Sequence, residues 1–358
     1  MKKFAKLLIV GLLALTLAAC SSTEKPEGGD DKGGKTYNIG LAIYSYNDNF
    51  MTAYRNELES YFAELGEKDG NTYNIDMQDG KGDQAHQTEQ LDNFITQQKD
   101  LIIANLVDPT GAENLINKAK ADDIPVVFIN REPKSVDDME IWLGKTAYVG
   151  ADATQSGYFQ GEMIADLDNK GDVNGDGVVK YFTLYGEPGN VDADQRTEYS
   201  VKALNDLEVK NEMIREKIQA DWDTEKARSA TADVLQTLGK DLEVIFANND
   251  GMAIGAIAAI EDAGLVPNED IYVVGVDAIG DAMELVKEGK LTGTVLNDHF
   301  NQSHTAAEVA VKLLNGEDVD SYYWHDYVKV VTEADAELSR KDYKVETTEQ
   351  VRARYAER

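Results

Sequence analysis

One short loop carries oxygen-bearing side chains at alternate positions. In "GDVNGDGVVKYF", residues 171–182, Asp172, Asn174 and Asp176 are separated by single residues and followed by a glycine. This order is typical of the first half of a calcium-binding loop. The ninth position is Lys180, a cation, and the twelfth is a threonine where such a loop needs a bidentate glutamate. The loop is therefore either a metal site completed from elsewhere in the chain or a turn that only resembles one.

Polar side chains also recur where short β-rich runs end, which is the edge at which open α/β sheets bind ligands. Carboxylates, amides and a guanidinium suit hydroxyl groups that both donate and accept, and aromatic faces suit the C–H faces of a sugar ring. The pattern indicates a polyol site. The residues at these ends are Tyr44, Asn47, Asp48, Asn105, Asp108, Asn130, Arg131, Asn190, Asp192, Arg196, Trp222, Asn249, Asp277 and Asn297.

Each of these residues has a structural alternative. Asp192, Asn249 and Asp277 stand where predicted helices begin and could serve as N-caps. Phe50 and Trp222 could belong to the hydrophobic core. The recurrence of polar groups at the same end of many strands favours a binding site.

The elements that must position these residues alternate along the chain. β-rich runs such as "YNIGLAIY", "DLIIANLV" and "IPVVFIN" are separated by longer helical stretches up to residue 130, and the series restarts at "AYVGAD". This alternation predicts parallel sheets covered by helices on both faces. The number of strands favours two α/β domains over one sheet.

Composition limits the partners. The 358-residue chain has 35 basic and 66 acidic residues, a formal net charge of −31, which argues against a nucleic-acid partner. Residues 1–19 combine three lysines with a short apolar run, as in a signal peptide. The run ends in "LAAC", which resembles a bacterial lipobox, so we expect lipid attachment at Cys20, the only cysteine. Residues 20–36 read as a flexible tether.

Eight phrases in order give the chain a specific resemblance. "IGLAIYSYNDNFM", "ANLVDP", "VVFINREP", "GEPGNVDADQR", "DWDT", "FANNDGMAIGA", "GVDA" and "GTVLND" are similar to the galactose/glucose-binding proteins of bacterial ABC sugar uptake, up to about residue 335. The last two dozen residues match poorly.

The resemblance implies an α/β, two-lobed periplasmic-binding-protein fold of the ribose/galactose type. Each lobe would be a parallel-sheet sandwich, and three hinge strands would join the lobes, which close on a monosaccharide. We expect the crossings near residues 146, 297 and 332. The N-terminal lobe would then hold residues 37–146 and 297–332, and the C-terminal lobe residues 147–296 and 333–358.

The resemblance also implies roles for single residues. Phe50 and Trp222 match an aromatic sandwich around a pyranose, and Asp48 matches the carboxylate that accepts the 4-hydroxyl. Asn190 stands where the family carries a histidine, which leaves galactose-versus-glucose preference open. The remaining implied sugar contacts and cleft-wall positions are Tyr44, Asn105, Asp192, Arg196, Asn249, Asp277 and Asn297.

The same resemblance completes the loop at 171–182 with Glu243. The implied Ca²⁺ ligands are then Asp172, Asn174, Asp176, the Val178 carbonyl and Glu243, an oxygen-only set. The family has a glutamine oxygen where this chain has Lys180. Either the lysine swings outward and a structural calcium is retained, which we expect, or its ammonium replaces the metal.

Together these features predict a monomeric, lipid-anchored, extracytoplasmic solute-binding protein that delivers D-galactose or D-glucose to an ABC permease. A sensor lipoprotein that presents its bound form to a chemoreceptor or sensor kinase has the same site. A glycosidase is disfavoured because no carboxylate has an evident cause for a raised pKa. The sequence also lacks the motifs of serine hydrolases, zinc proteases and P-loop enzymes.

Overall fold

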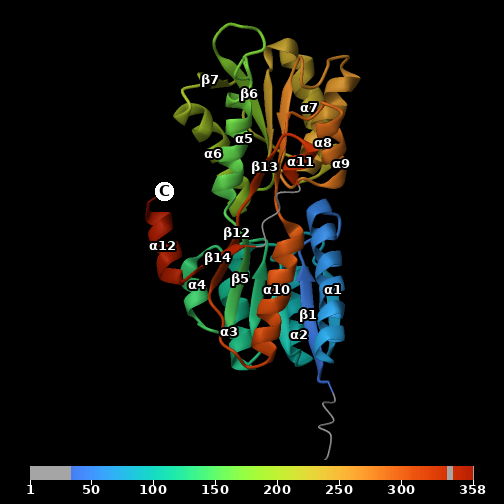
Figure 1. Cartoon of the computed structure of the whole chain (residues 1–358), viewed down its shortest axis with the longest axis vertical. Helices are drawn as coiled ribbons and strands as arrows, with labels where there is room; N and C mark the ends of the chain where they lie inside the picture. Colours follow the sequence, from blue (N-terminus) through green and yellow to red (C-terminus); the bar gives the residue numbers. More distant parts are fainter. Residues whose placement is uncertain (1–33, 337–341, 358) are drawn as a thin grey trace, which may run out of the picture. The chain divides into compact units, whose positions relative to one another are not determined.

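The computed structural model describes residues 34–336 and 342–357. The predicted signal peptide, Cys20 and the tether up to residue 33 lie outside the described residues. Two large sheets organise the described residues, each in its own lobe, and a third sheet of two strands accompanies them (Figure 1). The predicted two-lobed α/β fold is confirmed.

Within the described residues, the N-terminal lobe is built on a seven-stranded sheet. Five neighbouring strand pairs are parallel, and only the pair of β12 and β14 is antiparallel. In sheet order the strands are β14 (Tyr343–Glu346), β12 (Tyr322–His325), β5 (Thr146–Ala151), β4 (Val126–Ile129), β3 (Leu101–Ala104), β1 (Thr36–Ile43) and β2 (Thr72–Asp79).

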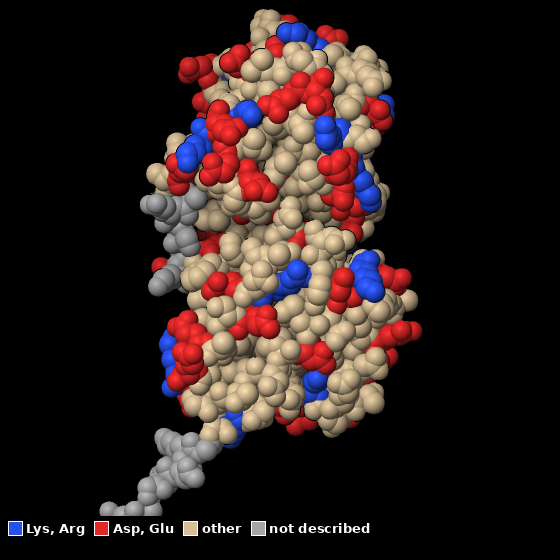
Figure 2. Space-filling view, turned by 90° about the vertical axis from the view of Figure 1, so that its right-hand side faces the viewer, with Lys and Arg blue, Asp and Glu red and all other residues tan. Residues whose placement is uncertain are grey.

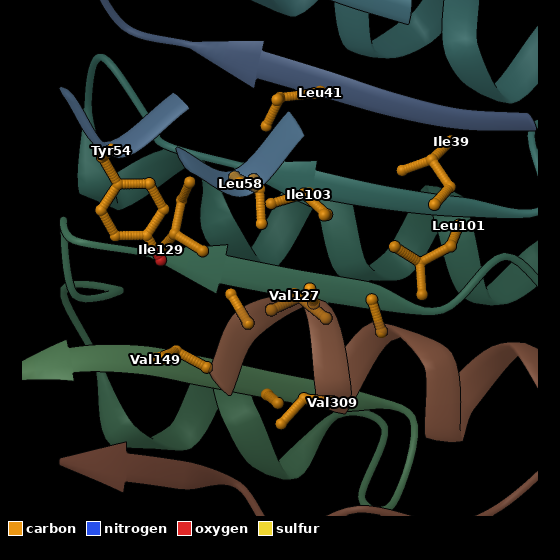
Figure 3. Packing of buried hydrophobic residues seen from close by; sticks show 14 of the residues in the cluster. Ile39, Leu41, Tyr54, Leu58, Leu101, Ile103, Val127, Ile129, Val149 and Val309 are labelled. Atoms are coloured by element: carbon orange, nitrogen blue, oxygen red, sulfur yellow. The ribbon is translucent and has the colours of Figure 1, made fainter. Parts of the chain in front are cut away.

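Helices cover both faces of this sheet, as expected when strands are apolar on both sides. On one face Leu41, Ile103 and Val127 pack against Leu58 of α1 and Val309 of α10 (Figure 3). On the other face, alternate residues of the same strands pack against α2, α3 and α4. The helices of this lobe are α1 (Asn49–Asp69), α2 (Gln84–Thr96), α3 (Ala112–Ala121), α4 (Val136–Glu140), α10 (His299–Leu314) and α12 (Thr348–Ala356), with a 3₁₀ turn at Pro109–Gly111.

The C-terminal lobe repeats this plan on a smaller parallel sheet. In β6 and β9 successive side chains alternate between two cores: Phe182 and Ile245 face α7 and α8, whereas Tyr181 and Phe246 face α5 and α6. The strands are β6 (Val179–Tyr185), β7 (Asn211–Met213), β8 (Ile218–Gln219), β9 (Val244–Ala247) and β10 (Tyr272–Val274). The helices are α5 (Ala153–Ala165), α6 (Val191–Asp206), α7 (Thr224–Leu238), α8 (Asp250–Asp262) and α9 (Gly280–Lys287), with a 3₁₀ turn at Gly239–Asp241.

The crossings between lobes differ in part from the prediction. β5 runs to Ala151 in the N-terminal sheet, so the chain leaves that lobe after residue 151 rather than near 146. β11 (Thr294–Leu296) leads back into α10, close to the predicted crossing at 297. The third crossing joins β12 to β13 (Val328–Val330), which pairs with β11, so it lies near 326 rather than 332.

The assignment of residues 333–358 to the C-terminal lobe is wrong for most of that segment. α11 (Glu333–Ala336) does contact β13 and α9. The described residues then resume in the N-terminal lobe, where β14 pairs antiparallel with β12 and α12 packs on α4. An unpaired edge strand exposes backbone donors and acceptors, and β14 covers the edge that β12 would otherwise present. In the described ranges no helix has the length and apolar character needed to cross a bilayer.

Candidate functional site

Among the described residues, twelve from both lobes line one cavity, which has a volume of about 30 Å³ and is partly open to solvent. All but two of them were predicted from the sequence as site residues. Asn105 was predicted but does not line the cavity, and Asn130 and Arg131 line it without having been assigned to the site. The lining residues are Tyr44, Asp48, Phe50, Asn130, Arg131, Asn190, Asp192, Arg196, Trp222, Asn249, Asp277 and Asn297.

The N-terminal wall is formed where β1 ends and α1 begins. Asp48 is the N-cap of α1, and its Oδ1 accepts the backbone N–H of Met51 at 2.6 Å. Its Oδ2 accepts the Tyr44 hydroxyl at 2.7 Å. Phe50 follows in the first turn, buried and edge-on to His299. Asp48 thus fixes the start of a helix and presents a carboxylate to the cavity with the same side chain.

Asn130 and Arg131 belong to this wall because of the turn that ends β4. Asn130 has φ 59°, a left-handed conformation that asparagine tolerates, and this turns the chain toward the cavity. The Arg131 guanidinium lies 3.5 Å from the centroid of the Tyr44 ring and donates to the Val107 carbonyl at 3.0 Å. Arg131 also forms an ion pair of 2.6 Å with Glu187, which belongs to the other lobe. In the sequence, the only sign that Asn130 and Arg131 belong to the site was their position at the end of a predicted strand.

Asn105 lies behind this wall. Its side chain is fully buried, accepts the backbone N–H of Tyr44 at 3.2 Å, and donates to the Ile129 carbonyl and to Asn130 Oδ1. The structure therefore does not support the predicted direct contact. Asn105 positions Tyr44 and Asn130 instead.

A buried arginine organises the C-terminal wall. Arg196, on α6, donates to the Asn248 carbonyl at 2.7 Å, to the Tyr327 hydroxyl at 3.1 Å and to Asp192 Oδ2 at 3.3 Å. Asn190 is the N-cap of the same helix, with Oδ1 accepting the backbone N–H of Ala193 at 3.0 Å. Burial raises the pKa of Asp192, and the Arg196 guanidinium opposes the shift.

Trp222 is held in a strained turn beside the cavity. Its φ is 63°, an uncommon value for a bulky residue, and such strain is found mostly at functional sites. The ring lies so close to Gly186 that a Cβ there would stand 2.2 Å from it. Asn249, the N-cap of α8, accepts the Met252 N–H at 2.9 Å and donates to the Trp222 carbonyl at 3.3 Å. Trp222 contacts the core at its margin, yet it is a cavity residue.

The floor of the cavity is an amide–carboxylate pair at the hinge. Asn297 donates to Asp277 Oδ1 at 3.2 Å, and Gln302 donates to Asn297 Oδ1 at 2.6 Å. Asp277 has φ 122°, a backbone conformation that favours glycine. It is not a helix N-cap, because that position before α9 is occupied by Ile279. Burial raises the pKa of Asp277 well above its ordinary value. The expectation that no cleft carboxylate has a cause for a raised pKa is therefore wrong.

The fold and the cavity agree with comparisons to known proteins. The periplasmic binding protein domain matches residues 39–318. This chain belongs to that family. It is 36% identical over 284 residues to the D-galactose/methyl-galactoside binding periplasmic protein MglB of Haemophilus influenzae, covering 78% of this chain and 82% of the relative. The putative rhizopine-binding protein of Rhizobium meliloti is 31% identical and is covered in full, over 96% of this chain.

A solved structure gives the same relationship. The ABC transporter solute binding protein from Bacillus halodurans with bound myo-inositol superposes with a TM-score of 0.72 at 30% identity, covering 86% of this chain and 98% of that one. This periplasmic binding protein is thus related over most of its length to proteins of one architecture.

In this periplasmic binding protein the predicted metal loop is also brought together. Glu243 reaches the loop from the residue before β9, and its Oε1 accepts the Asn174 N–H at 3.0 Å. The Lys180 ammonium lies 2.6 Å from Asp176 Oδ2. Among the described residues, no group of three or more His, Cys, Asp or Glu side chains is placed to hold a metal ion. The loop residues as arranged therefore do not fit the expected calcium site.

Proposed function

We propose that this periplasmic binding protein captures D-galactose or D-glucose outside the cytoplasm and delivers it to the permease of an ABC importer. The observation that carries the proposal is the composition of the cavity. One cavity is lined by three aromatic side chains, three aspartates and two buried arginines. The similarity to a D-galactose/methyl-galactoside binding protein supports the choice of a hexose.

The chemistry of this lining suits a pyranose. Phe50 and Trp222 offer aromatic faces for C–H groups, one from each lobe. Asp48, Asp192 and Asp277 supply carboxyl oxygens that accept hydrogen bonds from hydroxyl groups. A hydrogen bond to a carboxyl group in its charged form contributes about 1.5–3 kcal/mol. The protein is a solute-binding protein and not an enzyme, in keeping with its relatives. The carboxylates serve as acceptors rather than as an acid–base pair.

Closure of the two lobes would retain the ligand. Arg131 is anchored in the N-terminal lobe by the Tyr44 ring and a backbone carbonyl, and it reaches Glu187 in the C-terminal lobe. This ion pair forms only when the lobes are together, so it favours the closed form. A closed, ligand-bound form is what a permease can distinguish from the empty protein.

Attachment through Cys20 and the extracytoplasmic location remain part of the proposal. A lipid chain on Cys20 would hold the folded part at the outer face of the cytoplasmic membrane by the tether. Figure 2 shows acidic side chains spread over the visible face of the described residues, with basic ones interspersed and no broad basic patch on that face.

Titration calorimetry on the chain without its first 20 residues tests the ligand. We expect a dissociation constant in the micromolar range or tighter for D-galactose or D-glucose. Binding of myo-inositol or ribose with no heat from either hexose would overturn the hexose assignment.

The neighbouring genes distinguish uptake from sensing. Genes for an ATPase and a permease beside this one would support uptake, whereas a histidine kinase gene alone would support a sensing role. Loss of palmitate labelling in Cys20→Ala tests the anchor.

A further inference from the structure

We propose that the ammonium group of Lys180 closes the loop at residues 171–180 in place of a divalent cation, and that removing this ammonium uncovers a calcium site. The inference concerns a surface loop of the C-terminal lobe and does not depend on the identity of the sugar. It rests on the sequence pattern of the loop and on how the structure satisfies each of its oxygens.

Glu243 is committed to the loop backbone. The residue is fully buried, and its two carboxylate oxygens accept the backbone N–H groups of Asn174 at 3.0 Å and Lys180 at 2.9 Å. A buried carboxylate needs such donors because desolvation otherwise disfavours its charge. Glu243 therefore ties two points of the loop backbone together, one in its first half and one at its end.

The loop's own side chains are also satisfied internally. The two oxygens of Asp172 accept the N–H groups of Gly175 and Gly177, each at 2.8 Å. Asn174 Oδ1 accepts the Asp176 N–H at 2.9 Å. These bonds give the loop its fold from local donors, as in an Asx turn.

Lys180 supplies the positive charge. It occupies the ninth position of the pattern, and its Nζ donates to Asp176 Oδ2 at 2.6 Å. The carboxylates of Asp172, Asp176 and Glu243 place three formal negative charges around one short loop. An ammonium beside them offsets part of this charge and repels a second cation. Lysine donates only and has no lone pair for a metal when protonated, so it cannot be a ligand at neutral pH.

The geometry also explains why the site is latent rather than lost. The oxygen side chains of the calcium pattern are all retained at positions one, three and five, and Glu243 lies within reach of the third. A glutamine at position 180 removes the ammonium and adds a carbonyl oxygen of the type that calcium accepts. Since the Lys180–Asp176 pair is partly exposed, its removal alone is expected to disturb the fold little.

Thermal unfolding in 1 mM CaCl₂ and in EDTA tests the proposal on the full chain. We expect identical melting temperatures for the wild type and a rise of about 4–8 °C with calcium for Lys180→Gln, the shift that ~100-fold excess over Kd produces. Calorimetric titration with CaCl₂ should give a binding isotherm for Lys180→Gln only. Lys202→Gln is the matched control, because Lys202 forms the same type of 2.6 Å pair with Asp206 four residues away.

Two results would overturn the inference. A calcium-dependent melting shift in the wild type would mean that the metal binds beside the lysine. Lack of calcium binding in folded Lys180→Gln would mean that the loop is a turn without a latent site. Lys180→Met removes the charge without adding an oxygen ligand and should bind calcium more weakly than the glutamine variant. If Lys180→Gln does not fold, calcium binding by Lys180→Met decides the question.

Discussion

The ion pair between Arg131 and Glu187 allows lobe closure to be separated from sugar contact. Glu187 does not line the cavity, and besides Arg131 its side chain contacts Asn190, whose Nδ2 donates to Glu187 Oε1 at 3.5 Å. Arg131 is almost fully buried, with a side chain 4% exposed, whereas the Glu187 side chain is 29% exposed. Glu187→Ala therefore removes a link between lobes and leaves a buried guanidinium with its partners in one lobe only.

The size of the effect follows from this intermediate burial. Exposed ion pairs contribute about 0–1 kcal/mol, and truncating one partner of a buried pair costs about 2–5 kcal/mol. A pair with one buried and one partly exposed member lies between these limits, so we expect the closed form to lose about 1–2 kcal/mol. Because only the closed form retains the ligand, every sugar should bind about 5–30-fold more weakly.

Calorimetry with galactose and glucose, together with stopped-flow dissociation rates, measures this effect. The ratio of the two dissociation constants should stay unchanged, and dissociation should become faster. Asp262→Ala is the control, because it breaks a 2.6 Å pair with Arg228 that lies within one lobe. An unchanged affinity in Glu187→Ala would refute the closure argument. A changed preference between the two sugars would show instead that Glu187 acts on the ligand.

Three further predictions concern individual side chains. Trp222→Ala should weaken hexose binding at least ~10-fold and abolish the sugar-induced change in tryptophan fluorescence, while the protein stays folded. Unfolding of the C-terminal lobe in this variant would mean that Trp222 is a core residue. Burial raises the pKa of Glu132 to about 8, so the folded state retains a proton that the unfolded chain loses above about pH 4.5. The stability that this proton provides is complete at low pH and is lost as the pH rises through 8. The melting temperature of Glu132→Gln should therefore rise relative to that of the wild type between pH 5 and pH 9. A difference between the two melting temperatures that does not change with pH would contradict the raised pKa. Arg354→Ala should lower the free energy of unfolding by about 1–3 kcal/mol, because Arg354 ties α12 to Asp152 at the first crossing between the lobes. Arg352 is exposed, so Arg352→Ala should leave the melting temperature nearly unchanged. Equal effects of the two substitutions would mean that α12 does not act through the hinge.

The cavity could be predicted largely because parallel strands place their carboxyl ends at one edge of a sheet. Tyr44 follows β1, and Asn249 follows β9, so residues far apart in sequence converge by topology. Asn105 ends its strand in the same way, but its amide is consumed by neighbouring backbone groups. The position of a residue in the sequence determines the edge of the sheet at which its side chain lies. The direction in which that side chain points depends on which backbone groups of nearby loops need a hydrogen-bond partner.

The C-terminal segment was assigned to the wrong lobe because its local sequence pattern is weak. β14 has four residues, of which Lys344 and Glu346 are charged, and it gains its place by pairing with β12 rather than by burying an apolar face. Tyr322 and Trp324 of β12 stack at 5.5 Å, and the Arg354 guanidinium lies over the Trp324 ring. Such contacts are long-range, so no periodicity within residues 342–357 could have indicated them.

Of the three residues considered as N-caps, Asn249 both caps a helix and lines the cavity, whereas Asp192 and Asp277 line it without capping one. Asp48, Asn190 and Asn249 each cap a helix and also line the cavity. One oxygen of each side chain accepts a backbone N–H at the helix start, and the other polar atom remains available on the cavity side or to a neighbour. Three helix N-termini therefore meet at the cavity, where their partial positive charge offsets part of the charge of the three aspartates.

This double role limits which substitutions can test binding. Replacing an N-cap residue by alanine costs about 0.5–2 kcal/mol of stability, so Asp48→Ala would confound folding with binding. Asp48→Asn, Asn190→Asp and Asn249→Asp keep the capping oxygen, and only such substitutions can assign a change in affinity to the group that faces the sugar.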